Sequence, residues 1–190
     1  MTTIGFVSGE TVSAFFMRCL NGWVAAHPEY APNLIHVVSG PTLDVARNHL
    51  VEAFLRQDSD RLLMMDTDMV FRLDDLERLL AHDLDVVSGL YMAGDGRLMA
   101  APEWVEGLRA KWPPTPEYEW PGLCEVVATG MGCIAIKREV FEKIGSEWFN
   151  YLPTAGEDVS FCKRVADAGY TIWLDPTVKI GHVKPQVFMP

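Results

Sequence analysis

Short apolar runs alternate with amphipathic segments along most of the chain. The apolar runs predict strands at residues 4–7, 34–38, 62–65, 85–91, 125–128, 133–137 and 170–174. Apolar residues at helical spacing predict helices over about 11–27, 42–57, 73–82, 138–145 and 156–169. Strands that alternate with helices in this way are typical of an α/β fold, in which a mostly parallel central sheet is flanked by helices.

The chain has 190 residues, of which 49% are hydrophobic and 22% charged. These values are ordinary for a soluble globular protein and predict a single domain over residues 1–190. Residues 93–121 break the alternation, because they are too rich in proline and glycine for a long helix. We expect a flexible, Pro/Trp-rich insertion there. Its aromatic side chains either stack on a sugar or base or pack back onto the sheet, and they are Trp104, Trp112, Tyr118 and Trp120.

The net charge of −10 disfavours broad electrostatic binding to nucleic acid or to an anionic membrane, although it leaves room for a local basic groove. No Cys-x-x-Cys pair is present, so reduced structural thiols are expected. The first residues lack the basic and apolar regions of a signal peptide. No apolar run approaches the ~20 residues of a membrane helix. These features predict a cytoplasmic protein without a membrane span.

Two carboxylates, Asp66 and Asp68, directly follow the buried strand at 62–65. Ligands of open α/β sheets bind beyond the carboxyl ends of the strands. Carboxylate oxygens at that edge can hold a hard cation such as Mg²⁺ or Mn²⁺, which in turn can hold a diphosphate. The alternative is a solvated turn in which an aspartate caps the next helix.

Further candidate residues lie elsewhere in the chain. Arg47 falls off the apolar stripe of its helix, where it either reaches a phosphate or base or is solvated. Glu157 and Asp158 open a later helix, and favourable interaction with the helix N-terminus explains one of the two. Gly130 permits a tight turn or close approach to a ligand. His182 can be a hydrogen-bonded histidine near the chain end.

Taken together, these residues resemble the family 2-like glycosyltransferases of the GT-A fold, in the small single-domain form of bacteria and phages. The resemblance spans residues 4–183. It rests on an ordered set of motifs, which are Asp44-Val45-Ala46-Arg47-Asn48, Met65-Asp66-Thr67-Asp68-Met69, Thr129-Gly130-Met131-Gly132-Cys133, Glu157-Asp158-Val159-Ser160-Phe161-Cys162 and the ending Gly169-Tyr170, Asp175-Pro176, Gly181-His182. It implies metal-dependent transfer of a sugar, with inversion, from a UDP- or GDP-type nucleotide sugar to an acceptor hydroxyl on a saccharide, lipid, protein or modified DNA base.

The resemblance also implies roles for individual residues. Asp68 and His182 would bind Mn²⁺ or Mg²⁺, while Asp66 contacts the metal or the ribose. Asp158, with Glu157 beside it, would be the general base that takes the proton of the acceptor hydroxyl. The remaining donor contacts would come from Ser8, Gly9, Arg47, Gly130, Met131 and Gly132.

The chain departs from the family in being short. The acceptor side would therefore fall to residues 93–121 or to a second subunit of a homo-oligomer. Two alternatives stand beside the glycosyltransferase. One is a nucleotidyltransferase that uses a nucleotide–metal complex, although Ser8-Gly9-Glu10 lacks the Gly-rich, Lys/Arg-bearing loop of that class. The other is a non-catalytic sugar-binding domain of the same fold.

Overall fold

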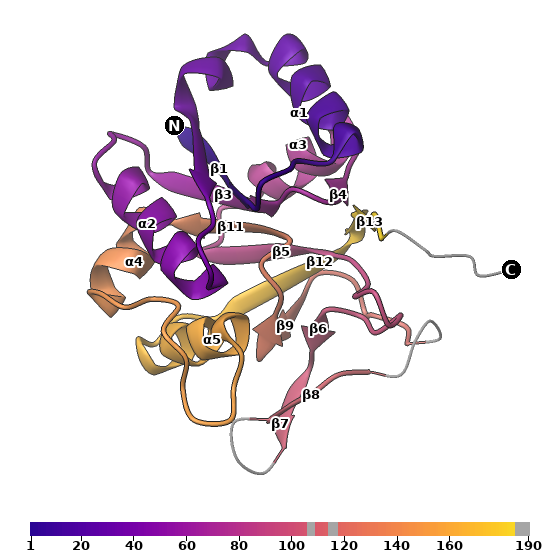
Figure 1. Cartoon of the computed structure of the whole chain (residues 1–190). Helices are drawn as coiled ribbons and strands as arrows, with labels where there is room; N and C mark the ends of the chain where they lie inside the picture. Colours follow the sequence, from indigo (N-terminus) through magenta and orange to yellow (C-terminus); the bar gives the residue numbers. More distant parts are fainter. Residues whose placement is uncertain (106–108, 114–117, 185–190) are drawn as a thin grey trace, which may run out of the picture.

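A seven-strand sheet forms the centre of the protein in the computed structural model, which describes residues 1–105, 109–113 and 118–184 (Figure 1). The strand order is β2-β1-β3-β11-β5-β12-β9. The bounds are β1 (Thr2–Ser8), β2 (Leu34–Val38), β3 (Arg61–Asp66), β5 (Val86–Leu90), β9 (Cys124–Val126), β11 (Cys133–Lys137) and β12 (Ile172–Lys179).

Five of these strands run in one direction. β1 is parallel to β2 and β3, and β12 is parallel to β5. β11 lies antiparallel between β3 and β5, with Cys133 opposite Met65 and Ile134 opposite Ser88. β9 is antiparallel to β12 at the edge. The predicted α/β fold with a mostly parallel sheet is therefore confirmed.

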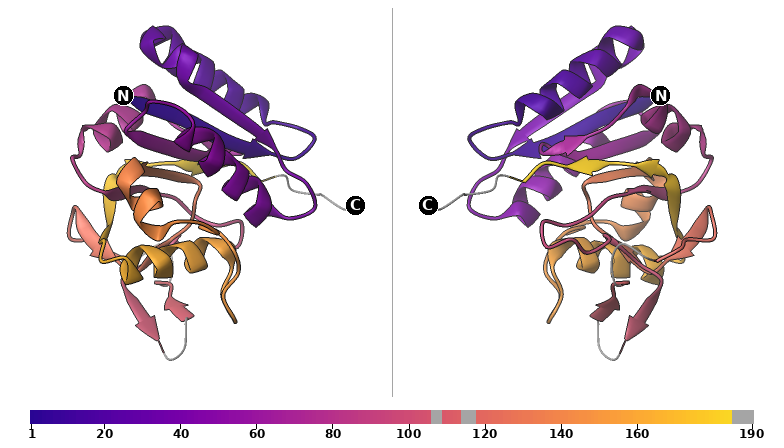
Figure 2. Two further views of the ribbon diagram at one scale, coloured as in Figure 1. Left: turned by 90° about the vertical axis from the view of Figure 1, so that its left-hand side faces the viewer. Right: turned by 90° about the vertical axis from the view of Figure 1, so that its right-hand side faces the viewer.

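Helices cover both faces of the sheet, as predicted (Figures 1 and 2). One face carries α1 (Ala14–Ala26) and α3 (Leu73–Ala81), and the other carries α2 (Leu43–Leu55), α4 (Arg138–Ile144) and α5 (Glu157–Asp167). A 3-10 helix, η1 (Pro28–Asn33), links α1 to β2. Each face has its own buried apolar cluster, around Phe16 and Leu76 on the first and Leu50 and Phe161 on the second.

Two helix faces differ from the prediction. Apolar spacing alone places Phe15 and Val45 on the inner faces of α1 and α2, but they are 60% and 47% exposed. Arg47, expected off the stripe, is only 3% exposed. The inward position of Arg47 is stable because two carboxylates neutralise its charge, and a count of apolar spacing does not register such pairing.

β12 continues past the point at which the sequence predicts its end. The strand runs through Asp175 and Pro176, and its register against β5 jumps between Asp175, opposite Gly89, and Lys179, opposite Leu90. β9 pairs with β12 only as far as Leu174. The proline is tolerated because it lies in this irregular, edge-like part of the strand.

Residues 93–121 contain short strands rather than a plain loop. These are β6 (Ala100–Ala101), which pairs with β10 (Ala128–Thr129), and the hairpin of β7 (Glu103–Val105) and β8 (Arg109–Lys111). Three of the aromatics pack against the core, namely Trp104, Trp112 and Trp120. Tyr118 is 37% exposed. The prediction of a loop rests in part on Gly107, Pro114 and Pro116, and these three residues lie outside the described part of the chain.

Among the described residues, no helix combines the length and the apolar character needed to cross a membrane. The four cysteines are free thiols.

Candidate functional site

The Asp66–Asp68 turn lies at the carboxyl end of β3 and is fixed by distant segments. Asp66 N–H donates to the Gly132 carbonyl at 3.1 Å, and Val183 N–H donates to the Asp68 carbonyl at 2.8 Å. β4 (Met69–Val70) then pairs with β13 (Gly181–His182). This short pairing, which the sequence does not predict, brings the end of the described chain to the turn.

The side chain of Asp68 meets two residues from that end. His182 Nε2 lies 3.0 Å from Asp68 Oδ2, and Lys184 Nζ lies 2.6 Å from the same oxygen. His182 Nδ1 lies 2.7 Å from the Met92 carbonyl oxygen. When the hydrogen is on Nδ1, that nitrogen donates a hydrogen bond to the Met92 carbonyl oxygen. The lone pair of Nε2 then points toward Asp68.

Asp68 and His182 fit a divalent cation as two of its ligands. Their separation of 3.0 Å is that of a hydrogen bond, and it is also compatible with two neighbouring donors, each about 2.1 Å from one cation. In a metal-binding histidine, the ring nitrogen that does not bind the metal usually donates a hydrogen bond, often to a backbone carbonyl, as His182 Nδ1 can to Met92. The described residues contain no group of three His, Cys, Asp or Glu that could hold a metal. Asp68, His182 and Asp66 as metal ligands stay predictions.

Arg47 links Asp66 to the start of α5. Its Nη2 donates to Asp66 Oδ1 at 3.0 Å, and its Nη1 donates to Glu157 Oε1 at 2.5 Å. Burial lowers the pKa of Arg47, but Asp66 and Glu157 outweigh burial and leave the pKa raised, so the guanidinium stays charged. The interpretation of a solvated Arg47 is wrong. Contact with a nucleotide stays a prediction.

Asp158 lies beside Glu157 in the first turn of α5. Its Oδ1 accepts a hydrogen bond from Val159 N–H at 2.7 Å. Burial raises the pKa of Asp158, and the neighbouring charge of Glu157 raises it further. Arg47 forms an ion pair with Glu157, whereas no described cation lies at ion-pair distance from Asp158.

A cleft of about 410 Å³ opens beside the Asp66–Asp68 turn. It brings together five predicted site residues, which are Ser8, Gly9, Asp66, Asp68 and His182. The other lining residues are not among the predicted site residues, and they are Val7, Ser39, Gly40, Leu43, Thr67 and Lys184. Ser39 and Gly40 had a usable signal, because they follow the predicted strand at 34–38 and parallel neighbours end at the same edge of a sheet.

Gly130, Met131 and Gly132 are buried and do not line this cleft, and the two glycines pack against Tyr91. Gly132 N–H donates to Tyr91 Oη at 3.0 Å. A Cβ on Gly130 would collide with that hydroxyl oxygen, and one on Gly132 would lie 2.7 Å from Tyr91 Cζ. The glycines therefore admit the tyrosine ring. Their contact with the donor sugar stays a prediction.

Tyr91 is the main residue that the sequence analysis missed. Its ring stands edge-on to His182, with 5.8 Å between ring centroids. Burial raises the pKa of its hydroxyl, so the group stays protonated. The available signal was its position directly after β5, at the same edge of the sheet as Asp66.

No known protein family matches the chain by sequence, and no curated protein does. Among solved structures, A197 from STIV is similar with a TM-score of 0.63 and 20% identity, over 99% of this chain and 97% of that one. GalNAc-T7, crystallised with UDP, GalNAc and Mn²⁺, is similar with a TM-score of 0.63 and 15% identity. The likeness covers 96% of this chain but 44% of GalNAc-T7. The inositol-1-phosphate CTP transferase from T. maritima reaches a TM-score of 0.47 at 10% identity, which is too low to favour a function. At these identities the likeness defines the fold, which is GT-A-like.

Proposed function

We propose that this chain is a glycosyltransferase that moves a sugar from a nucleoside-diphosphate sugar, of UDP or GDP type, to an acceptor hydroxyl. The observation that carries the proposal is the meeting of Asp68 with His182 at one end of β3, on a GT-A-like fold. The fold neighbour GalNAc-T7 was crystallised with UDP, GalNAc and Mn²⁺, which supports a donor of this class.

The cleft beside Asp68 suits the donor. One wall of the cleft has only small side chains, which leave room for a nucleoside. The residues of this wall are Ser8, Gly9, Ser39 and Gly40. Asp68 and His182 at the other side would hold Mn²⁺ or Mg²⁺. A divalent cation held there supplies positive charge to the diphosphate as it leaves the sugar.

Asp158 suits the acceptor side. A hydroxyl that attacks the sugar must lose its proton, and a positioned carboxylate that accepts it contributes about 10²–10⁴ in rate. The raised pKa of Asp158 brings its basicity closer to neutral pH. Glu157 serves a different purpose, because its ion pair with Arg47 orients the start of α5. Inversion at the sugar carbon is the outcome that the resemblance to family 2 implies.

The test is slow hydrolysis of a panel of UDP- and GDP-sugars, in which water replaces the acceptor. We expect release of UDP or GDP from at least one donor, dependent on Mn²⁺ or Mg²⁺. Asp158→Asn should reduce release by about 10²–10⁴ and keep donor binding. Asp58→Asn, at an exposed position, is the matched control.

A second assay, with a nucleoside triphosphate and a sugar 1-phosphate as substrates, tests the nucleotidyltransferase alternative. A nucleotidyltransferase would release pyrophosphate from a nucleoside triphosphate and a sugar 1-phosphate, and that result without nucleoside-diphosphate release would overturn the proposal. Full activity of Asp158→Asn would remove Asp158 as the base.

A further inference from the structure

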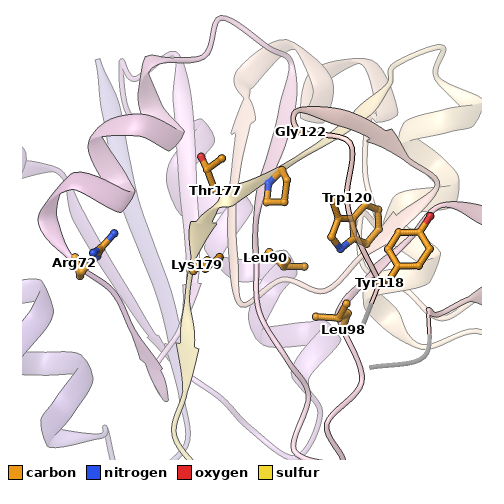
Figure 3. A pocket seen from close by; sticks show the side chains of 9 residues that line it. Arg72, Leu90, Leu98, Tyr118, Trp120, Gly122, Thr177 and Lys179 are labelled. Carbon is orange, nitrogen blue, oxygen red and sulfur yellow. The ribbon is translucent and has the colours of Figure 1, made fainter. Parts of the chain in front are cut away.

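A second, larger cavity lies beside the outer edge of β12 (Figure 3). Its volume is about 740 Å³, within the range of about 300–1,000 Å³ typical of small-molecule sites. It shares no lining residue with the cleft at Asp68. The mechanism proposed above therefore leaves it unused.

One wall of this cavity is aromatic. Tyr118 and Trp120 lie edge to face, with 4.7 Å between ring centroids. Figure 3 shows both rings beside Leu90 and Leu98. Trp120 is anchored because it also packs against the core. Anchored aromatic rings next to aliphatic side chains suit the C–H face of a sugar ring, which is apolar although its rim is polar.

The facing wall is an unpaired strand edge. β9 pairs with β12 only through Leu174, and no other described strand pairs with that edge from Asp175 to Lys179. Along this edge Pro176 has no N–H and the Thr177 N–H donates to Asp175 Oδ1, so backbone carbonyl groups are what the edge offers to a ligand. Sugar hydroxyls can serve as donors and acceptors at the same time.

The cavity also carries positive charge. Within the described chain no carboxylate lies at ion-pair distance from Lys179, which Figure 3 places beside Leu90. Arg72 forms ion pairs with Asp74 and Asp75, which neutralise its charge, so the positive charge at this cavity comes from Lys179. In a chain of net charge −10, a cationic group at a cavity favours an anionic ligand.

One short segment links the cavity to His182. The turn between Tyr91 and Met99 is closed by a bridge of Met92 with Leu98. Leu98 lines the cavity, and its bridge partner Met92 contacts His182 through its carbonyl oxygen. A ligand in the cavity would therefore lie against the same short segment that supports His182 through Met92.

We propose that this cavity binds an anionic saccharide. Its ring lies on Trp120 and Tyr118, its hydroxyls contact the β12 edge, and its acidic group lies at Lys179. The site anchors the acceptor at a distance from the reacting hydroxyl. Only this anchoring role rests on the proposed function, because binding does not require transfer.

Titrations observed through the tryptophan indole N–H signals test the proposal. The ligands are glucose, galactose, mannose and N-acetylglucosamine, each as the free sugar and as its 6-phosphate, with inorganic phosphate as a further probe. Trp120→Phe identifies the Trp120 signal. We expect at least one sugar phosphate to shift this signal saturably, and to bind at least tenfold more tightly than its free sugar and than inorganic phosphate.

Lys179→Met should reduce the affinity for the sugar phosphate to that for the free sugar, and Tyr118→Ala should weaken both. Lys143→Met, at an exposed lysine on α4, should change neither. The proposal is overturned if no sugar phosphate shifts the Trp120 signal, or if inorganic phosphate binds as tightly as the sugar phosphates. Asp68→Asn should keep this binding, so loss of the donor function and loss of the saccharide site are separate results.

Discussion

Lys184 Nζ lies 2.6 Å from Asp68 Oδ2, the oxygen that His182 Nε2 approaches at 3.0 Å. Asp66 is held in a similar way by Arg47. Each carboxylate of the Asp-x-Asp motif therefore has a cation of the chain itself as its partner. A divalent cation that binds Asp68 must compete with the Lys184 ammonium.

Replacement of Lys184 by methionine should tighten binding of Mn²⁺ in the absence of nucleotide. The gain should be up to about fivefold, because exposed ion pairs contribute about 0.2–1 kcal/mol. Free Mn²⁺ measured by electron paramagnetic resonance gives the affinity, and Lys143→Met is the control. Weaker Mn²⁺ binding in Lys184→Met would show that the ammonium does not compete for Asp68.

Arg47→Met should destabilise the protein by about 3–5 kcal/mol, because it leaves Asp66 and Glu157 without their buried partner. Denaturant unfolding measures the loss. Arg56→Met, at the exposed end of α2, should stay within about 0.5 kcal/mol of the parent. An equally small effect at Arg47 would mean that the two ion pairs contribute little to stability.

Asp158→Asn should stabilise the protein at neutral pH while it removes transfer. Because the folded protein raises the pKa of Asp158 above the ordinary 3.8, this group favours folding at low pH, and its contribution is lost as pH rises through the folded pKa. The asparagine avoids that loss, and each 1 kcal/mol gained adds about 2–4 °C to Tm.

Thermal unfolding across pH 3–8 measures the effect of Asp158→Asn, and the advantage of the variant should grow as pH rises. A variant that is less stable than the parent at pH 7 would contradict the assigned burial cost of Asp158.

Gly130→Ala should cost about 1–3 kcal/mol, because the new methyl group collides with the Tyr91 hydroxyl. Tyr91→Phe in the same chain removes that oxygen and should restore part of the loss. Gly22→Ala is the control, since no atom lies within 4 Å of its Cβ position in α1 and the change favours the helix. If Gly130→Ala costs the same stability in the parent and in the Tyr91→Phe background, the new methyl group must collide with a group other than the Tyr91 hydroxyl.

The order of strands and helices could be predicted because apolar runs and capping residues act locally. Ser13 Oγ accepts the Phe15 N–H at the start of α1, and Gly145, with φ of 96°, ends α4. The direction of β11 could not be predicted, because a buried strand has the same apolar sequence pattern whether it is parallel or antiparallel to its neighbours. The continuation of β12 through Pro176 depends on a register jump against β5.

The candidate site was predictable where residues follow strand ends, as at Asp66 and Asp68. Other parts depend on contacts between remote residues. Arg47 is inward because Glu157, 110 positions later, accepts its hydrogen bond. Lys184 reaches Asp68 across 116 positions through the pairing of β13 with β4. No local pattern carries information about such pairs.

The central claim is that Asp68 binds a nucleoside diphosphate through a divalent cation. The most direct measurement is calorimetric titration of UDP and of GDP into the protein and into Asp68→Asn, each with and without Mn²⁺. We predict that one nucleotide binds the parent only with Mn²⁺ and that folded Asp68→Asn loses this binding. Equal binding by Asp68→Asn, or binding that does not depend on Mn²⁺, would contradict the claim.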